Sequence, residues 1–182
     1  MPNISNDPLL GLGKAFAIIL QIASALVGGL ALLLIPLAIL INQGIITGIF
    51  DGPNAPLFVQ YPISGVALLL AIALFLAACF LFFGKLRAMI GTIGEGDPFT
   101  PENAQRLRMM AWLALAIQVL ALVVAWLRVH SGSLWAGREG PGLFVDFGRE
   151  DIIGAMTVIV LFILARVFSH GTAMREDLEG TV

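Results

Sequence analysis

The sequence predicts an all-α membrane protein with four transmembrane helices in one bundle. Four long apolar runs carry this prediction, and they cover approximately residues 15–41, 63–83, 109–127 and 152–168. None of them contains Asp, Glu, Lys or Arg, except that Arg166 lies in the last turn of the fourth run. Roughly 20 helical residues cross the hydrocarbon layer of a bilayer, and the second and third runs fit that length well. The first run is long enough to tilt or kink, and the fourth is short but can be extended by its flanking residues.

The composition of the chain supports the same class. Only 12% of the 182 residues are charged, whereas a soluble domain carries about 25%. The four runs and their connectors use nearly the whole length, so we expect a single integral membrane domain over residues 1–182. The net charge of −2 offers no basic face, which argues against direct binding of nucleic acid.

The first run is longer than the roughly 7–15-residue core of a signal peptide, so we expect the protein to keep it. It contains two pairs of small residues at a spacing that lets helix backbones approach closely, Ser24 with Gly28 and Ala25 with Gly29. Two uses of this spacing are open, packing inside the bundle and formation of a homo-oligomer.

The first and third connectors contain β-prone segments. Ile45–Phe50 and Leu57–Tyr61 flank a turn cluster, and Leu143–Phe147 alternates around Asp146. These segments predict either short β-strands on the outer face or irregular loops that rest on the membrane interface.

The second connector predicts an ordered turn between two long helices. Apolar residues at helical spacing continue past the second run, so its helix is expected to end at about Gly91–Gly94. Thr100 is a favourable N-cap, Pro101 suits the first helical position, and Glu102 complements the positive end of the helix dipole. The next helix is therefore expected to run from Pro101 to about Val129.

The distribution of basic residues predicts the orientation. With both termini inside, seven Lys and Arg residues face the cytoplasm and three face the other side. The positive-inside rule therefore favours a multi-pass protein of the cytoplasmic (inner) membrane with both termini in the cytoplasm. The seven inner residues are Lys14, Lys85, Arg87, Arg106, Arg108, Arg166 and Arg175.

Residues with catalytic or metal-binding patterns are scarce. His130 and His170 follow different runs at opposite sides, so they cannot hold one haem or metal between them. Gln118 is the most central polar residue of the third run and predicts an interhelical hydrogen bond, with a ligand or lipid contact as the alternative. The adjacent carboxylates Glu150 and Asp151 are expected to be solvated charges at a helix end. The sequence thus predicts no enzyme activity and no cofactor.

Two polar segments carry a family resemblance. Residues 96–108 read GDPFTPENAQRLR, and residues 175–182 read REDLEGTV. Together with four membrane spans, they resemble the bacterial membrane proteins of the domain of unknown function 2975 family. The resemblance covers the chain from the second span to its end, and the GDPF-x-PENA-x-x-LR signature is fairly specific.

The resemblance implies a partner in the cytoplasm. Members of this family are often encoded beside a small helix-turn-helix regulator, which implies a regulatory or sensory membrane protein that binds such a regulator. The alternatives are a small transporter or channel and a structural accessory subunit. The tail itself has two possible uses, an ion pair from Arg175 to Asp97 or Glu102, and contact with the soluble partner. The predicted partner-binding residues are Asp97, Pro98, Phe99, Glu102, Asn103, Arg106, Arg175, Glu176, Asp177 and Glu179.

Overall fold

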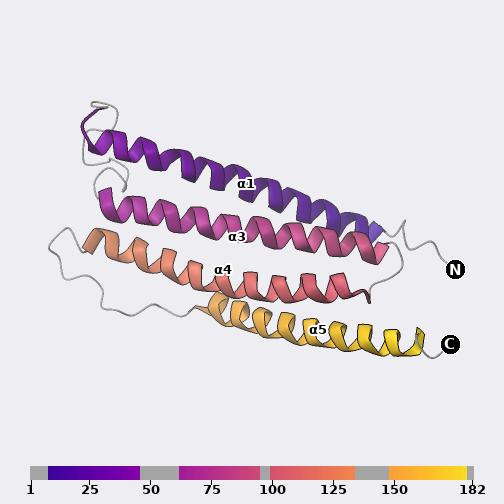
Figure 1. Cartoon of the computed structure of the whole chain (residues 1–182). Coiled ribbons are helices and arrows are strands. Elements are labelled where there is room, and N and C mark those ends of the chain that lie inside the picture. The colour runs from indigo at the N-terminus through magenta and orange to yellow at the C-terminus, as the bar shows by residue number, and fades with distance from the viewer. Residues whose placement is uncertain (1–7, 46–61, 95–98, 134–147, 180–182) are drawn as a thin grey trace. The chain divides into compact units, whose positions relative to one another are not determined.

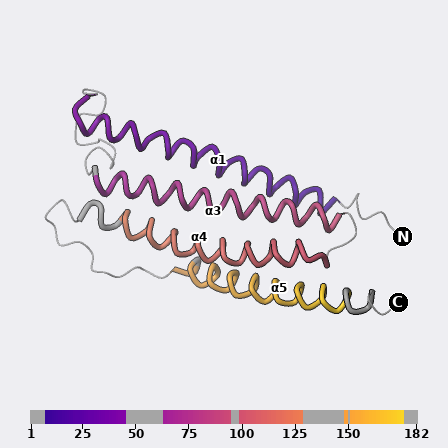
Figure 2. The backbone as a smooth tube through the Cα atoms, in the orientation of Figure 1, coloured from indigo at the N-terminus to yellow at the C-terminus, as the bar shows by residue number. Residues whose placement is uncertain are grey.

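The computed structural model describes residues 8–45, 62–94, 99–133 and 148–179, and these residues form four helices and their short flanks (Figures 1 and 2). Each of the four helices is long and apolar enough to cross a membrane, as predicted. The described residues contain no strand, and the predicted strand segments fall mainly in residues 46–61 and 134–147, outside the described ranges. The helices are α1 (Pro8–Asn42), α3 (Pro62–Gly94), α4 (Pro101–Ser133) and α5 (Arg149–Glu179).

Each helix is longer than its apolar run and includes polar residues beyond the ends of that run. The predicted end of α3 at Gly91–Gly94 and the predicted start of α4 at Pro101 are confirmed. The fourth run was predicted over residues 152–168, but α5 continues to Glu179, about 11 residues further. At 1.5 Å per residue this extension is roughly 16 Å long, so α5 reaches well past its apolar part.

Side chains and glycine geometry explain where individual helices begin and end. After α1, the N–H of Ile45 donates to the carbonyl of Leu40 at 3.1 Å and the N–H of Gly44 to that of Ile41 at 3.0 Å. Gly44 has a φ of 70°, which glycine adopts without steric cost, so α1 ends in a Schellman motif. At the start of α4, the Asn103 N–H donates to Thr100 Oγ1 at 3.3 Å, which confirms Thr100 as the N-cap.

The exposed surface of the helices is apolar. Large side chains such as Leu26, Leu33 and Ile159 are 70%, 70% and 59% exposed, and the mean hydropathy of the chain is +0.97. In water, so large an apolar surface would drive aggregation or association. These faces are therefore suited to contact with lipid chains, which agrees with the length and composition of the helices.

The chain divides into two compact units that share three of the helices. The first contains Met1–Ala23, Ala78–Gln118 and Gly148–Val182, and the second contains Ser24–Ala77 and Val119–Phe147. Inside the first unit, α1 packs on α3, where a side chain at Gly84 would begin 3.0 Å from Nε2 of Gln21.

Inside the second unit, the small-residue spacing of α1 serves packing within the chain. Ser24 and Gly28 are buried, and a Cβ at Gly28 would lie 3.2 Å from the Cβ of Leu76 on α3. Gly28 therefore allows the two backbones to approach closely. Ala25 and Gly29 are exposed, and a Cβ at Gly29 would meet nothing within 4 Å.

Candidate functional site

The signature segment lies where α3 ends and α4 begins, in the first compact unit. Its described part, residues 99–108, supplies the N-cap and the first two turns of α4. The last turn of α3 and the C-terminal half of α5 belong to the same unit. We call this region the signature end and define it as residues 84–94, 99–112 and 162–175. Asp97 and Pro98 of the signature lie outside the described residues.

A buried asparagine connects α3 to α4 at the signature end. Asn103 is 0% exposed, and its Oδ1 lies 2.9 Å from the Thr92 hydroxyl of α3. Arg106, one turn later on α4, donates from its guanidinium to the same Oδ1 at 3.0 Å and to the carbonyl of Ala88 at 3.4 Å. The Thr92 hydroxyl also lies 2.8 Å from the Met89 carbonyl, so its single proton is shared between two acceptors.

These bonds hold the described end of α3 to the described start of α4. A hydrogen bond in a water-poor interior is stronger than in water, and an unpaired polar group there is correspondingly costly. Asn103 therefore holds the end of α3 and the start of α4 in one register, and Arg106 reinforces that link from a second position. The α3–α4 turn is consequently an ordered structure at its described ends.

An aromatic contact adds α5 to this arrangement. The rings of Phe99 and Phe168 lie 5.0 Å apart between centroids, with an interplanar angle of 31°. Gly171, one turn after Phe168, leaves room for the same ring, since a Cβ there would begin 3.0 Å from Cδ1 of Phe99. Phe99 thus packs the residues before α4 against the C-terminal half of α5, while 44% of its side chain stays exposed.

The predicted partner-binding residues therefore fall into different environments. Phe99, Glu102 and Arg175 are exposed, Arg106 is half-buried, and Asn103 is inside the protein. In this conformation Asn103 has no surface for a partner, so any contribution it makes to binding is through the position of the turn. Glu176, Asp177 and Glu179 lie on α5, and their side chains are outside the described residues. The proposed pairing of Arg175 with Asp97 or Glu102 stays a prediction.

A second polar cluster joins α4 to α5. The sequence predicted the role of Gln118 in it but not that of Asp151. The Gln118 amide donates from Nε2 to Oδ1 of Asp151 at 3.2 Å and to its backbone carbonyl at 3.4 Å. The other carboxylate oxygen of Asp151 accepts the N–H of Gly148 at 2.9 Å, which caps α5. The predicted interhelical hydrogen bond of Gln118 is thus confirmed, whereas Asp151 is half-buried and bonded instead of solvated.

The reason for this difference is the close approach of the two helices. A side chain on Gly154 would collide with Gln118, since its Cβ would begin 2.6 Å from Cδ of that glutamine. Gly154 therefore leaves the space that the Gln118 amide occupies. The signal available in the sequence was the pattern Gly148-x-x-Asp151-x-x-Gly154, a helix cap followed one turn later by a residue without a side chain.

The described residues show no arrangement suited to a metal ion, since no group of three or more His, Cys, Asp or Glu side chains gathers among them. The clusters described above consist instead of amides, hydroxyls, single charges and aromatic rings. In the structure these groups bond helices of the chain to one another.

Comparison with known proteins gives one match. A family model described as Protein of unknown function (DUF2975) matches residues 49–182, which include the signature end and the tail. No curated protein and no solved structure matches the chain.

Proposed function

Because the chain belongs to the DUF2975 family of proteins of unknown function, we propose that it is a non-enzymatic membrane protein with a regulatory or sensory role. Its signature end and tail bind a cytoplasmic protein, such as the small helix-turn-helix regulator that the family resemblance implies. The single observation that carries this proposal is the construction of the signature end, where buried polar bonds hold exposed residues in place.

Two polar residues, the buried Asn103 and the half-buried Arg106, bond to each other and link the start of α4 to the end of α3. Such networks make a structure specific and rigid when every member is bonded. The exposed residues beside them, Phe99 and Glu102, are thereby presented in a defined arrangement, which lowers the entropy that a partner must overcome on binding.

The tail offers charge that complements a DNA-binding protein. From Arg175 to Glu179 the chain carries one basic and three acidic residues, and α5 stays helical through this stretch. DNA-binding proteins carry a basic face that contacts phosphates. An acidic helix end that extends beyond the membrane is suited to that face, so partner binding and DNA binding would compete.

The proposed orientation places the signature end in the cytoplasm. The first compact unit contains all seven basic residues that were predicted to face inward, together with Arg149. We expect a green fluorescent protein fused after Val182 to be fluorescent and alkaline phosphatase at the same position to be inactive. Phosphatase fused within residues 46–61 is the matched control and is expected to be active. An active phosphatase after Val182 would contradict the orientation.

Charge reversal in the tail is expected to weaken binding of the partner. We expect Glu176→Lys/Asp177→Lys to raise the Kd for the neighbouring regulator on the order of tenfold, with most of the effect at low salt, because exposed charges steer association. The measurement is biolayer interferometry with the purified full-length protein in nanodiscs and the purified regulator. The matched control is Glu139→Lys/Glu150→Lys, which makes the same charge change at the other side.

Two outcomes would count against the proposal. If both double variants change the Kd equally, the acidic tail is not the contact. If the unsubstituted protein does not bind the regulator at any salt concentration, the regulator is not its partner.

A small transporter or channel is the second candidate, and the pair of Gln118 and Asp151 favours it. Ionisable groups between membrane helices are rare and often serve transport. The bonds of Asp151 to Gly148 and Gln118 account for it as a helix cap, which is why we rank transport second. Solute flux in proteoliposomes that is lost in Gln118→Leu would reverse this order.

A further inference from the structure

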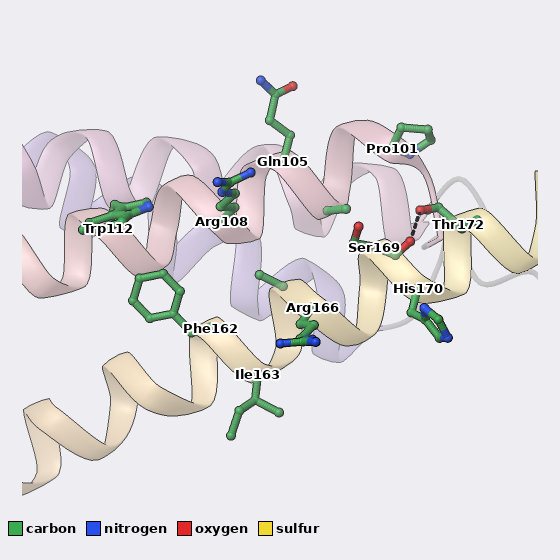
Figure 3. Close-up of a pocket in the computed structure, with 13 residues that line it drawn as sticks. Pro101, Gln105, Arg108, Trp112, Phe162, Ile163, Arg166, Ser169, His170 and Thr172 are labelled. Carbon is green, nitrogen blue, oxygen red and sulfur yellow. Dashed lines mark hydrogen bonds between the residues drawn. The ribbon is translucent and has the colours of Figure 1, made fainter.

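An open groove of about 1120 Å³ lies between the N-terminal part of α4 and the C-terminal half of α5 (Figure 3). Both walls belong to the first compact unit. The groove is lined at one level by Trp112 and Phe162, whose rings meet edge to face with 5.4 Å between centroids. The groove lies within the signature end, but neither the Asn103–Arg106 bonds nor the Gln118 cluster lines it.

The side chains change in character along the groove. From the ring pair, one helical turn toward the start of α4 leads to Arg108, and one turn toward the end of α5 leads to Arg166. Figure 3 shows both arginines beside the ring pair, on the side toward Pro101. A further turn adds hydrogen-bonding residues at the groove's polar end, namely Gln105, Ser169 and His170.

This gradient coincides with the edge of the membrane spans. The apolar run of α4 begins immediately after Arg108, and that of α5 ends at Phe168, just beyond Arg166. From these positions we expect both guanidinium groups at the depth of lipid head groups, and the ring pair one helical turn deeper, among acyl chains.

The charges in the groove are of one sign. Arg108 and Arg166 are exposed, and none of the described residues that line the groove is Asp or Glu. An anion that enters the groove is attracted by both positive charges. Guanidinium groups bind phosphate through paired N–H donors, and basic pockets between transmembrane helices are typical sites for anionic lipid head groups.

We propose that this groove binds an anionic phospholipid. The phosphate lies between Arg108 and Arg166, the polar head group contacts the residues of the next turn, and an acyl chain lies against Trp112 and Phe162. The apolar half of the groove selects a lipid over a free anion, because a soluble phosphate would leave that half uncovered. This inference does not depend on the proposed partner, since it concerns the purified protein in a bilayer.

Trp112 provides the measurement. In a Trp126→Phe/Trp135→Phe background it is the only tryptophan, so brominated lipids that enter the groove quench its fluorescence. The full-length protein is placed in bilayers that contain brominated phosphatidylglycerol or brominated phosphatidylcholine at equal mole fraction. We expect phosphatidylglycerol to quench more strongly, with a relative binding constant at least about fivefold higher, as expected for one basic residue near a lipid surface.

Substitutions distinguish lipid binding in the groove from a general attraction of anionic lipids to the charged protein. Arg108→Gln/Arg166→Gln is expected to bring the preference close to one, whereas Arg108→Lys/Arg166→Lys retains most of it because the charge is kept. Arg149→Gln removes one positive charge at the other end of α5 and is expected to leave the preference unchanged. The helix content of each variant is checked by circular dichroism, and the lysine variant provides the comparison if the glutamine variant does not fold.

Three outcomes would overturn the proposal. The first is equal quenching by the two lipids in the protein that carries both arginines. The second is a preference that Arg149→Gln lowers as much as the double glutamine variant does. The third is loss of the preference on addition of inorganic phosphate but not of chloride at matched ionic strength, which would identify a site for free phosphate.

Discussion

Replacement of Asn103 by Leu is expected to lower the free energy of unfolding by about 2–3 kcal/mol. The side chain is fully buried, and its Oδ1 is an acceptor for Thr92 and for the Arg106 guanidinium. Loss of that oxygen leaves the Arg106 donor without its closest partner, and an unsatisfied buried polar group costs about 1–3 kcal/mol, more when it is charged. The measurement is denaturant unfolding in detergent, followed by circular dichroism.

Two controls make this expectation specific. Gln105→Leu makes a similar change two residues later on an exposed position of α4, and it is expected to stay within about 0.5 kcal/mol of the unsubstituted protein. Asn103→Asp keeps an acceptor for Arg106 and is expected to lose less stability than Asn103→Leu. If Asn103→Leu and Gln105→Leu unfold at the same denaturant concentration, the network does not hold α3 to α4.

The second large effect is expected at Gly154. Gly154→Ala should lower the free energy of unfolding when Gln118 is present and raise it when Gln118 is replaced by Ala. With Gln118 present, Gly154→Ala forces the amide away from Asp151, and the lost charge-assisted bond costs about 2 kcal/mol. Alanine returns up to about 1 kcal/mol through its higher helix propensity. We therefore expect a net destabilisation of about 1 kcal/mol in the same unfolding measurement.

In a Gln118→Ala background the obstacle is gone, and Gly154→Ala is expected to stabilise the protein by about 0.5–1 kcal/mol. The double-mutant cycle should thus give a coupling of about 2 kcal/mol. Gly29→Ala is the reference, because that helical glycine has open space around its missing side chain and should show only the propensity gain. Equal effects of Gly154→Ala in both backgrounds would mean that Gln118 does not occupy the space beside α5.

Local chemistry explains why much of the fold could be read directly from the chain. The apolar runs, the N-cap at Thr100 and the glycines that end α3 act through neighbours a few residues away, and all appear in the structure where they were predicted. The signature residues were also recognised from their order alone. Their division into buried and exposed members was not, because a polar residue on a helix gives no indication of which neighbour will cover it.

The four apolar helices and the position of the turn between α3 and α4 follow from the order of residues alone, since apolar length, capping and glycine act between adjacent residues. The packing of the helices, in contrast, puts Asn103 inside the protein, bonds Asp151 to Gln118, and makes Arg108 and Arg166 line one groove. Each of these depends on how two helices are placed side by side. That placement results from many small contacts between residues far apart in the chain, and no local pattern encodes it.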